Sequence, residues 1–261
     1  MLFSQKLGPG GHGIVLLHGF MGSGRNVRGL AQAWSEKNPS LFFSMPDLTG
    51  HGRSPALPEG ADVFTLARDV IATARADGIE GPLRIVGHSL GGRVGLAAIL
   101  LDPSEVEEVV LLDVAPGPID PSKVESGQVL EIYRGAPETA TSRDEMRAYF
   151  AERGLPSARA EWLLTNLVRE GEIFRWRVDR EALAALHRRT SGVDLWAALE
   201  AGVRVHEIRG SASPFVTEED ADRLGALGCR VETVEGADHY LHVTHTEEVA
   251  RRLNEHFARA H

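Results

Sequence analysis

The residues with the clearest chemical meaning form the pattern Gly-x-Ser-x-Gly at residues 87–91, with Ser89 at its centre. An apolar segment of strand length, residues 83–87, leads into the pattern, and a segment of helix length, residues 90–101, follows it. A serine at such a strand-to-helix turn must take a strained backbone conformation, which flanking glycines permit. The turn lifts the hydroxyl above the sheet, and the helix N-terminus points at the reacting centre. We therefore predict that Ser89 is a nucleophile.

His239 is the candidate for the general base, because a serine hydroxyl is a poor nucleophile at neutral pH unless a histidine accepts its proton. It ends the loop of residues 235–239, between the last predicted strand and the last predicted helix. From there an imidazole can reach over the edge of the sheet to Ser89. His242 and His245 are competitors nearer to the helix, where surface or core packing is their expected role.

Asp113 is the candidate for the carboxylate that holds the histidine in the correct tautomer. It ends a strongly apolar strand predicted at residues 106–113, the next strand after the serine, and a charged group at such a strand end needs a partner. The order Ser, Asp, His along the chain also agrees with a known order of triad residues. If Asp113 only caps its strand, Glu218 or Asp220 is the alternative acid.

The negative charge that develops on a substrate carbonyl oxygen must meet hydrogen-bond donors that are already in position. We predict that the backbone N–H groups of Phe20 and Leu90 are these donors. Leu90 follows the nucleophile directly, and Phe20 lies in the glycine-rich loop at residues 17–24. His18, in the same loop, is expected to fix the loop by hydrogen bonding rather than to transfer protons.

Alternating strands and helices are predicted to position these residues. Short apolar runs predict strands, and amphipathic stretches predict helices. The predicted strands are residues 13–19, 41–45, 83–87, 106–113, 203–209 and 230–235. The predicted helices are residues 27–36, 63–76, 90–101, 218–227 and 247–258. This order specifies an α/β fold with a mostly parallel sheet and helices on both faces.

The alternation stops between residues 116 and 200, where we predict successive helices and no strand. These helices cover residues 142–152, 158–169 and 180–187, and residues 170–172 form a turn between two of them. We predict a core domain of residues 1–115 and 201–261, with residues 116–200 inserted as a helical cap. Trp176 lies in this insertion and is a candidate for lining a substrate pocket; the alternative is that it buries the cap against the core.

Composition places the chain among ordinary globular proteins, with 261 residues of which 43% are hydrophobic and 25% charged. The formal net charge of −9 argues against nucleic acid as a partner, since the overall field repels a phosphate backbone. The single cysteine, Cys229, can form no internal disulfide, and no Cys/His cluster offers a metal site. No apolar run is long enough to span a bilayer, and the first residues lack the features of a signal peptide. We therefore expect a cytoplasmic protein without a membrane partner, and its oligomeric state is left open.

Four segments resemble the signatures of the α/β-hydrolase family and occur in the usual order. They are residues 18–20, 47–54, 87–92 and 236–239. The resemblance extends over nearly the whole chain. It implies the α/β-hydrolase fold, with an inserted helical cap, and serine hydrolase chemistry that needs no cofactor and no metal.

Three further segments, residues 112–116, 170–178 and 209–216, resemble a subgroup of small carboxylesterases. In that subgroup the triad Asp follows the strand after the nucleophile, which favours Asp113. Many other members of the fold carry the Asp after a later strand, and residues 208–215 of this chain contain no carboxylate. The resemblance implies hydrolysis of short-chain acyl esters, or thioesters, with a small ester and water as substrates.

A second resemblance, carried by residues 18–24 and 89–93, is to the menaquinone-pathway synthase of the same fold, which eliminates pyruvate. In that enzyme type Arg93 would bind a substrate carboxylate; the alternative is an ion pair on a helix surface. The synthase keeps its Asp after the later strand, where this chain has Ser213. Elimination is therefore the second hypothesis, and a ligand receptor that retains the triad is the third.

Overall fold

The computed structural model describes residues 1–9, 13–120 and 125–258, whose centre is a seven-stranded sheet. The strand order is β1-β3-β2-β4-β5-β9-β10, and β1 alone runs antiparallel to its neighbour. The strands are β1 (Ser4–Leu7), β2 (Gly13–Leu17), β3 (Phe42–Pro46), β4 (Leu83–His88), β5 (Val106–Leu112), β9 (Arg204–Gly210) and β10 (Arg230–Val234). Six of the seven were predicted from apolar runs. The sequence analysis missed β1, which is a short, half-exposed edge strand.

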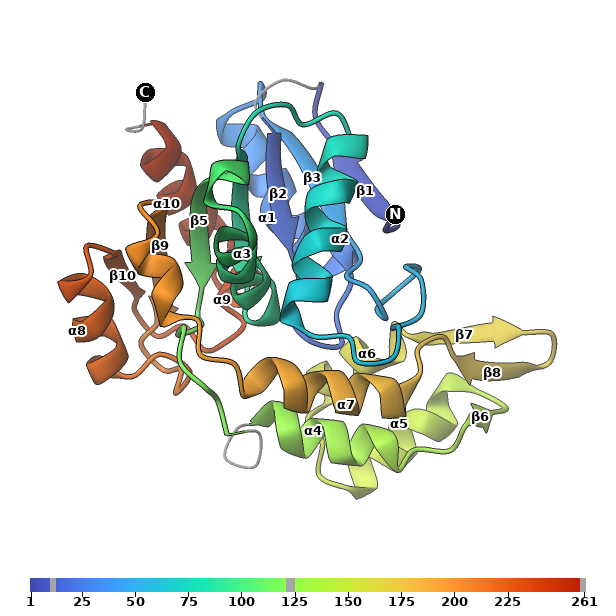
Figure 1. The fold of residues 1–261 in the computed structure, drawn as a ribbon. Coiled ribbons are helices and arrows are strands. Elements are labelled where there is room, and N and C mark those ends of the chain that lie inside the picture. The colour runs from blue at the N-terminus through green and yellow to red at the C-terminus, as the bar shows by residue number, and fades with distance from the viewer. Residues whose placement is uncertain (10–12, 121–124, 259–261) are drawn as a thin grey trace.

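Helices cover both faces of this sheet, because the side chains of its buried strands alternate between the faces. Ile14 and Leu16 pack with Trp34, on the side of α1 (Gly24–Lys37) and α10 (Thr246–Ala258). Val15 and Leu17 pack on the opposite side with α2 (Val63–Ala76) and α3 (Leu90–Leu101), which lie in front of the sheet in Figure 1. The remaining elements around the core are η1 (Pro103–Glu105), η3 (Trp196–Glu200), α8 (Glu218–Ala226) and α9 (Leu241–Thr244). The predicted α/β-hydrolase fold is confirmed.

The segment between β5 and β9 lies across the carboxyl ends of the parallel strands (Figure 1). It contains the helices α4 (Glu125–Arg134), α5 (Arg143–Glu152), α6 (Ser157–Leu164) and α7 (Arg180–Ser191). It also contains a second sheet of the three strands β6 (Thr139–Ala140), β7 (Leu167–Glu170) and β8 (Ile173–Trp176). The prediction that this segment holds only helices was therefore wrong. The turn at residues 170–172 joins two strands, and it was misread because each strand has only four residues, of which a single one is buried.

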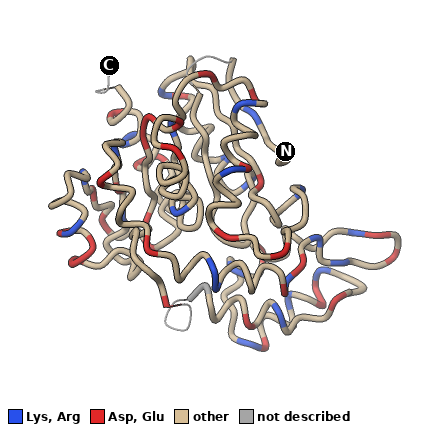
Figure 2. The backbone as a smooth tube through the Cα atoms, in the orientation of Figure 1, with Lys and Arg blue, Asp and Glu red and all other residues tan. Residues whose placement is uncertain are grey.

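Charged residues are interspersed rather than gathered by sign. Lys and Arg alternate with Asp and Glu along the helices and on the β7–β8 hairpin, as Figure 2 shows for the described chain. In the same residues, no helix is long and apolar enough to cross a membrane.

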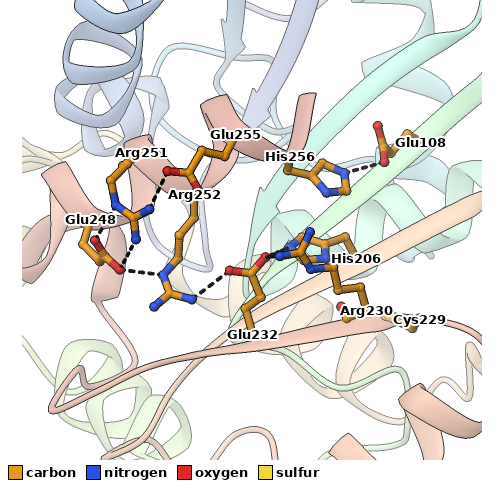
Figure 3. Close-up of polar contacts among 10 residues, drawn as sticks. All are labelled: Glu108, His206, Cys229, Arg230, Glu232, Glu248, Arg251, Arg252, Glu255 and His256. Carbon is orange, nitrogen blue, oxygen red and sulfur yellow. Dashed lines mark hydrogen bonds and ion pairs between the residues drawn. The ribbon is translucent and has the colours of Figure 1, made fainter. Parts of the chain in front are cut away.

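A network of ion pairs joins α10 to β10 (Figure 3). The Arg252 guanidinium donates to Glu232 on β10 at 2.7 Å and to Glu248 on its own helix at 2.8 Å. His256 contacts Glu108 of β5 at 2.5 Å. Because the loop that carries His239 connects β10 to α9 and α10, this network holds both ends of that loop against the sheet.

Candidate active site

Ser89 occupies a tight turn between β4 and α3, with φ of 51° and ψ of −116°. Such a backbone is strained for a residue with a side chain, and its amide is held by the Leu112 carbonyl at 3.1 Å. The neighbouring chain approaches so closely that only glycine fits beside it. A Cβ on Gly87 would lie 2.3 Å from the Gly91 carbonyl carbon, and one on Gly91 would lie 2.7 Å from Leu17. The turn therefore requires the glycines of the Gly-x-Ser-x-Gly pattern.

Asp113 and His239 are in direct contact, although 126 residues of sequence separate them. The Nδ1 atom of His239 donates to Oδ2 of Asp113 at 2.6 Å, and the carboxylate is completely buried. The Phe215 ring stacks on the imidazole, with the ring centroids 3.8 Å apart. With Nδ1 engaged by the carboxylate, Nε2 is the nitrogen that can accept a proton. His239 and Ser89 line one cavity.

The Asp113 carboxylate has two further donors, one from the last residue of β9 and one from the loop that follows it. The Gly210 amide donates to Oδ1 at 2.9 Å, and the Ser213 hydroxyl donates to Oδ2. From the sequence, residue 213 was recognised only as a position without a carboxylate. The structure shows that the serine at this position binds Asp113, the acid that follows the neighbouring strand β5. Asp113 itself has φ of 59°, a left-handed conformation that is uncommon for a residue other than glycine.

The two alternative acids have other partners. Glu218 is exposed and pairs with Arg209 at 2.7 Å. Asp220 accepts hydrogen bonds from Thr217 at the start of α8. The structure therefore brings Asp113, rather than either alternative, to His239.

Phe20 and Leu90 both lie next to the Ser89 site. Leu90 is the first residue of α3, and Phe20 lines the cavity that contains Ser89. Among the described residues, the backbone N–H of neither has a hydrogen-bond partner, so both are free to donate. The buried Asn166 side chain donates to the Met21 carbonyl at 3.1 Å and so holds the loop of residues 17–24 in place. Within this loop Met21 has φ of 59°. Nothing in the sequence pattern marked Asn166.

The cavity around Ser89 is narrow, with a volume of about 20 Å³. Aromatic and aliphatic side chains form most of its wall: Phe20, Met21, Val129, Trp162, Phe215 and Tyr240. A larger groove of about 380 Å³ adjoins it, and Trp162 and Tyr240 contribute to both. Their rings meet edge to face with centroids 5.8 Å apart and so divide the two spaces.

Arg93 was predicted as a possible substrate-binding residue, and the structure contradicts this prediction. Its side chain is only 2% exposed and does not line the cavity around Ser89. The guanidinium donates to backbone carbonyls on both connections between the core and the cap segment, those of Ala115, Pro116, Gly117, Thr190 and Val193. Burial lowers its pKa to about 10, which still leaves it charged at neutral pH. Arg93 therefore fastens the segment between β5 and β9 to α3, and its burial also excludes a surface ion pair.

Trp176 was the other predicted substrate-binding residue, and it also lies away from the cavity around Ser89. Its Nε1 donates to the Pro137 carbonyl at 2.7 Å, and its ring packs edge to face on Tyr133, with centroids 4.8 Å apart. The side chain is buried within the cap segment and lines no part of the cavity at Ser89. The aromatic residue of this segment that does line the cavity is Trp162.

Four buried histidines, His18, His51, His88 and His242, surround the site in neutral form. Burial lowers the pKa of His18 to about 4, and those of His51 and His242 to about 3. Both ring nitrogens of His18 are used by the loops: Nδ1 donates to the Gly19 carbonyl at 2.7 Å, and Nε2 accepts from the Leu48 amide at 2.9 Å. His18 is therefore not available for proton transfer.

These histidines predict a protein that is sensitive to mild acid. Their pKa values are lower in the folded chain than the unfolded value near 6.5, so the unfolded chain binds more protons below pH 6.5. Between pH 7 and pH 5.5 each should lower the free energy of unfolding by about 1 kcal/mol. Urea unfolding at these two pH values measures the change, and the variant His51→Gln should show a smaller one. Equal stability of the wild type at both pH values would contradict the prediction.

No metal site adjoins the triad. Within residues 1–9, 13–120 and 125–258, no group of three or more His, Cys, Asp or Glu residues could hold a metal ion.

Cys229, directly before β10, is buried and forms no disulfide, and burial raises the pKa of its thiol to about 12. A thiol in that state is a packing group rather than a nucleophile.

Comparison with known proteins identifies a family and several proteins that are similar to this chain. The model of the Alpha/beta hydrolase family matches residues 14–252. Esterase YbfF of Escherichia coli is 27% identical, with 92% of this chain and 91% of the esterase covered. The sn-1-specific diacylglycerol lipase ABHD11 of Xenopus laevis is 28% identical, with 90% of this chain and 76% of the lipase covered.

Among solved structures, a marine microorganism esterase superimposes with a TM-score of 0.85 at 22% identity. The superposition covers 97% of this chain and 98% of that esterase. At this identity the likeness concerns the fold, including the segment between β5 and β9.

Proposed function

This chain belongs to the alpha/beta hydrolase family, and we propose that it hydrolyses carboxylic esters of short acyl groups through a Ser-His-Asp triad and an acyl-enzyme intermediate. The observation that carries the proposal is the 2.6 Å contact between His239 and Asp113, at a cavity that also contains the strained Ser89. An esterase and a lipase among the relatives support an ester as substrate. The narrow space at Ser89 supports a small acyl group.

In the first half of the proposed reaction, Ser89 Oγ attacks the ester carbonyl carbon while His239 Nε2 accepts the hydroxyl proton. The backbone N–H groups of Phe20 and Leu90 donate to the oxygen that becomes negatively charged. When the tetrahedral intermediate collapses, the bond to the alcohol oxygen breaks, and His239 gives its proton to that oxygen. The alcohol leaves, and the acyl group remains bound to Ser89 as an ester.

In the second half, water replaces the alcohol. His239 takes a proton from the water as it attacks the acyl carbon, and the same two amides stabilise the second oxyanion. Collapse returns the proton to Ser89 and releases the carboxylic acid. Asp113 remains ionised throughout and stabilises the imidazolium each time it forms.

The segment of residues 116–200 is part of this proposal as a cap over the site. Asn166 donates to the loop that contains Phe20, and Trp162 walls the cavity, so this segment touches both that loop and the substrate space. The single cysteine is compatible with the reducing cytoplasm, where we propose that the protein acts.

Elimination of pyruvate is the weaker candidate. That hypothesis used Arg93 as the group that binds a substrate carboxylate, and its guanidinium is instead occupied by backbone carbonyls. A ligand receptor with an intact triad is distinguished from an esterase by turnover. A receptor would give at most one slow acylation event per molecule.

The proposal is tested by the steady-state hydrolysis of p-nitrophenyl acetate, butyrate and octanoate. We expect multiple turnovers of acetate and butyrate, and a kcat/KM for octanoate at least about tenfold lower, because the rings of Phe20, Trp162 and Tyr240 close the space beside Ser89. Absence of turnover with all three esters would overturn the proposal.

Trp162 should set this chain-length limit, since it separates the cavity at Ser89 from the larger groove. Trp162→Ala is expected to raise kcat/KM for octanoate relative to acetate by about tenfold, as the two spaces merge. Ile173→Ala, which changes an exposed side chain of the same segment, is the matched control and should leave the ratio unchanged. An unchanged ratio in Trp162→Ala would show that the chain is accommodated elsewhere.

A further inference from the structure

Glu207 is a completely buried carboxyl group behind the triad acid. It lies on β9, paired in register with Leu111 of β5 and Val231 of β10. Its Oε1 accepts a hydrogen bond from the Asp113 amide at 3.0 Å, and its Oε2 has no hydrogen-bond partner. Neither the proposed chemistry nor the sequence motifs use this residue.

Within residues 1–9, 13–120 and 125–258, no cationic side chain pairs with Glu207. The ionisable groups that act on it are Asp113 at the end of β5, Arg209 on its own strand and Cys229 before β10. The guanidinium of Arg209 is directed elsewhere, to Glu218 at 2.7 Å and Thr233 at 3.1 Å. Burial, followed by the nearby Asp113 carboxylate, raises the pKa of Glu207 well above its usual range. Burial and this neighbouring negative charge therefore favour the uncharged carboxylic acid over the carboxylate.

We propose that Glu207 is a positioning residue, which in its neutral form accepts the Asp113 amide hydrogen and keeps the Asp113 backbone in the conformation that aims its carboxylate at His239. This inference rests on the proposed function, since it concerns the same triad. It assigns the residue a role through Asp113, without contact with substrate.

The backbone of Asp113 needs such a restraint. Its left-handed conformation, with φ of 59°, is unfavourable for a residue with a side chain. The Asp113 amide has two acceptors, the Ile208 carbonyl and Glu207 Oε1, each at 3.0 Å. These bonds fix the backbone from which the carboxylate reaches Gly210, Ser213 and His239.

The proposed role of Glu207 also depends on its neutral state. An ionised Glu207 would place a second negative charge next to Asp113 in a site of low dielectric, which would favour the protonated form of His239. A base that is already protonated cannot accept the proton of Ser89. A carboxylic acid provides the same acceptor oxygen without that charge.

The first experiment compares kcat, KM and the pH profile of ester hydrolysis in Glu207→Gln and Glu207→Leu with those of the wild type. The Gln amide keeps an acceptor oxygen and no charge, so kcat should remain within about threefold. The Leu variant has no acceptor, so kcat should fall by about tenfold to a hundredfold with KM little changed, and the acid limb of kcat/KM should move to lower pH. A residue that served only folding would lower the thermal midpoint without moving that limb.

The second experiment tests the neutral state without using activity. A carboxyl whose pKa is raised on folding binds a proton that the unfolded chain has lost, so its stabilising effect declines as pH rises above about 4.5. Relative to Glu207→Gln, the unfolding equilibrium constant of the wild type should rise with pH above about 4.5, by up to about tenfold per pH unit until the pH reaches the folded-state pKa of Glu207. This comparison remains valid if the protein hydrolyses none of the esters offered.

Two results would overturn the proposal. One is a Glu207→Leu variant with the kcat and pH profile of the wild type. The other is a parallel pH dependence of stability in the wild type and Glu207→Gln, which would mean that Glu207 is ionised in the folded chain. If Glu207→Leu fails to fold, the pH dependence of stability in the wild type and in Glu207→Gln still tests the proposal.

Discussion

Ser89→Ala is expected to lower kcat for p-nitrophenyl butyrate by about 10⁵-fold or more, to the rate that binding and oxyanion stabilisation alone support. The reason is that alanine removes the only atom that forms the acyl-enzyme bond, while the elbow backbone at φ of 51° is retained. The wild type should also show a stoichiometric burst of p-nitrophenol, or a mass increase equal to the acyl group, when deacylation is slow. Rapid-quench mass spectrometry measures that adduct.

Ser104→Ala is the matched control for this substitution. Ser104 is exposed and lies before β5, at the end of the strand opposite Asp113, so its loss should leave kcat unchanged. Retention of more than about 1% of the activity in Ser89→Ala would mean that another group carries the acyl chain. An adduct that forms in the wild type without further turnover would favour the receptor hypothesis.

The elbow could be predicted from the sequence because strand, serine and helix are contiguous there. Residues 90–101 were predicted as a helix and form α3 with those bounds, and the strand before them ends at His88 rather than Gly87. Local spacing and glycine chemistry suffice for such a unit, since all its constraints lie within a few residues. Asp113 and His239 were also assigned by position, as residues that follow strands, and the structure brings them into contact.

The roles of Arg93 and Trp176 could not be read in the same way. Both residues have side chains long enough to reach a substrate or the protein's own backbone, and the sequence does not specify which is nearer. The Arg93 guanidinium meets carbonyls from residues 115–117 and from residues 190 and 193, which become neighbours only in the folded chain. Glu207 illustrates the same limit, because a single acid on a strand that also carries Arg204, His206 and Arg209 gives no local sign of its partner.

The position of the acid is the most distinctive feature of this site. Its carboxylate is attached to the end of β5, yet two of its three partners are Gly210, the last residue of β9, and Ser213 in the loop that follows β9. The two strands are neighbours in the sheet, so a carboxylate from either strand end can reach the same place beside His239. A triad acid can therefore be attached to the end of β5 or to the end of β9 and keep the same partners beside His239.

Asp113→Asn is accordingly expected to lower kcat by about 10⁴-fold with little change in KM. The amide would keep the shape of the side chain, but it cannot stabilise the imidazolium, and its NH₂ group would face His239 Nδ1 and favour the wrong tautomer. Initial rates of p-nitrophenyl butyrate hydrolysis across pH 6 to 9 measure the loss. Glu218→Gln and Asp220→Asn are the controls, and both should retain activity within about threefold because neither contacts His239.

A second substitution separates loss of the acid from loss of the fold. Ser213 Oγ already bonds the Asp113 oxygen that contacts His239, so the longer side chain in Ser213→Asp can reach His239 Nδ1 itself. Combined with Asp113→Asn, it should recover at least about tenfold of the lost kcat, because a carboxylate again faces the imidazole from the other strand end. If Asp113→Asn alone keeps its activity, then His239 works without this carboxylate. In that case the buried contact between them serves the structure rather than the reaction.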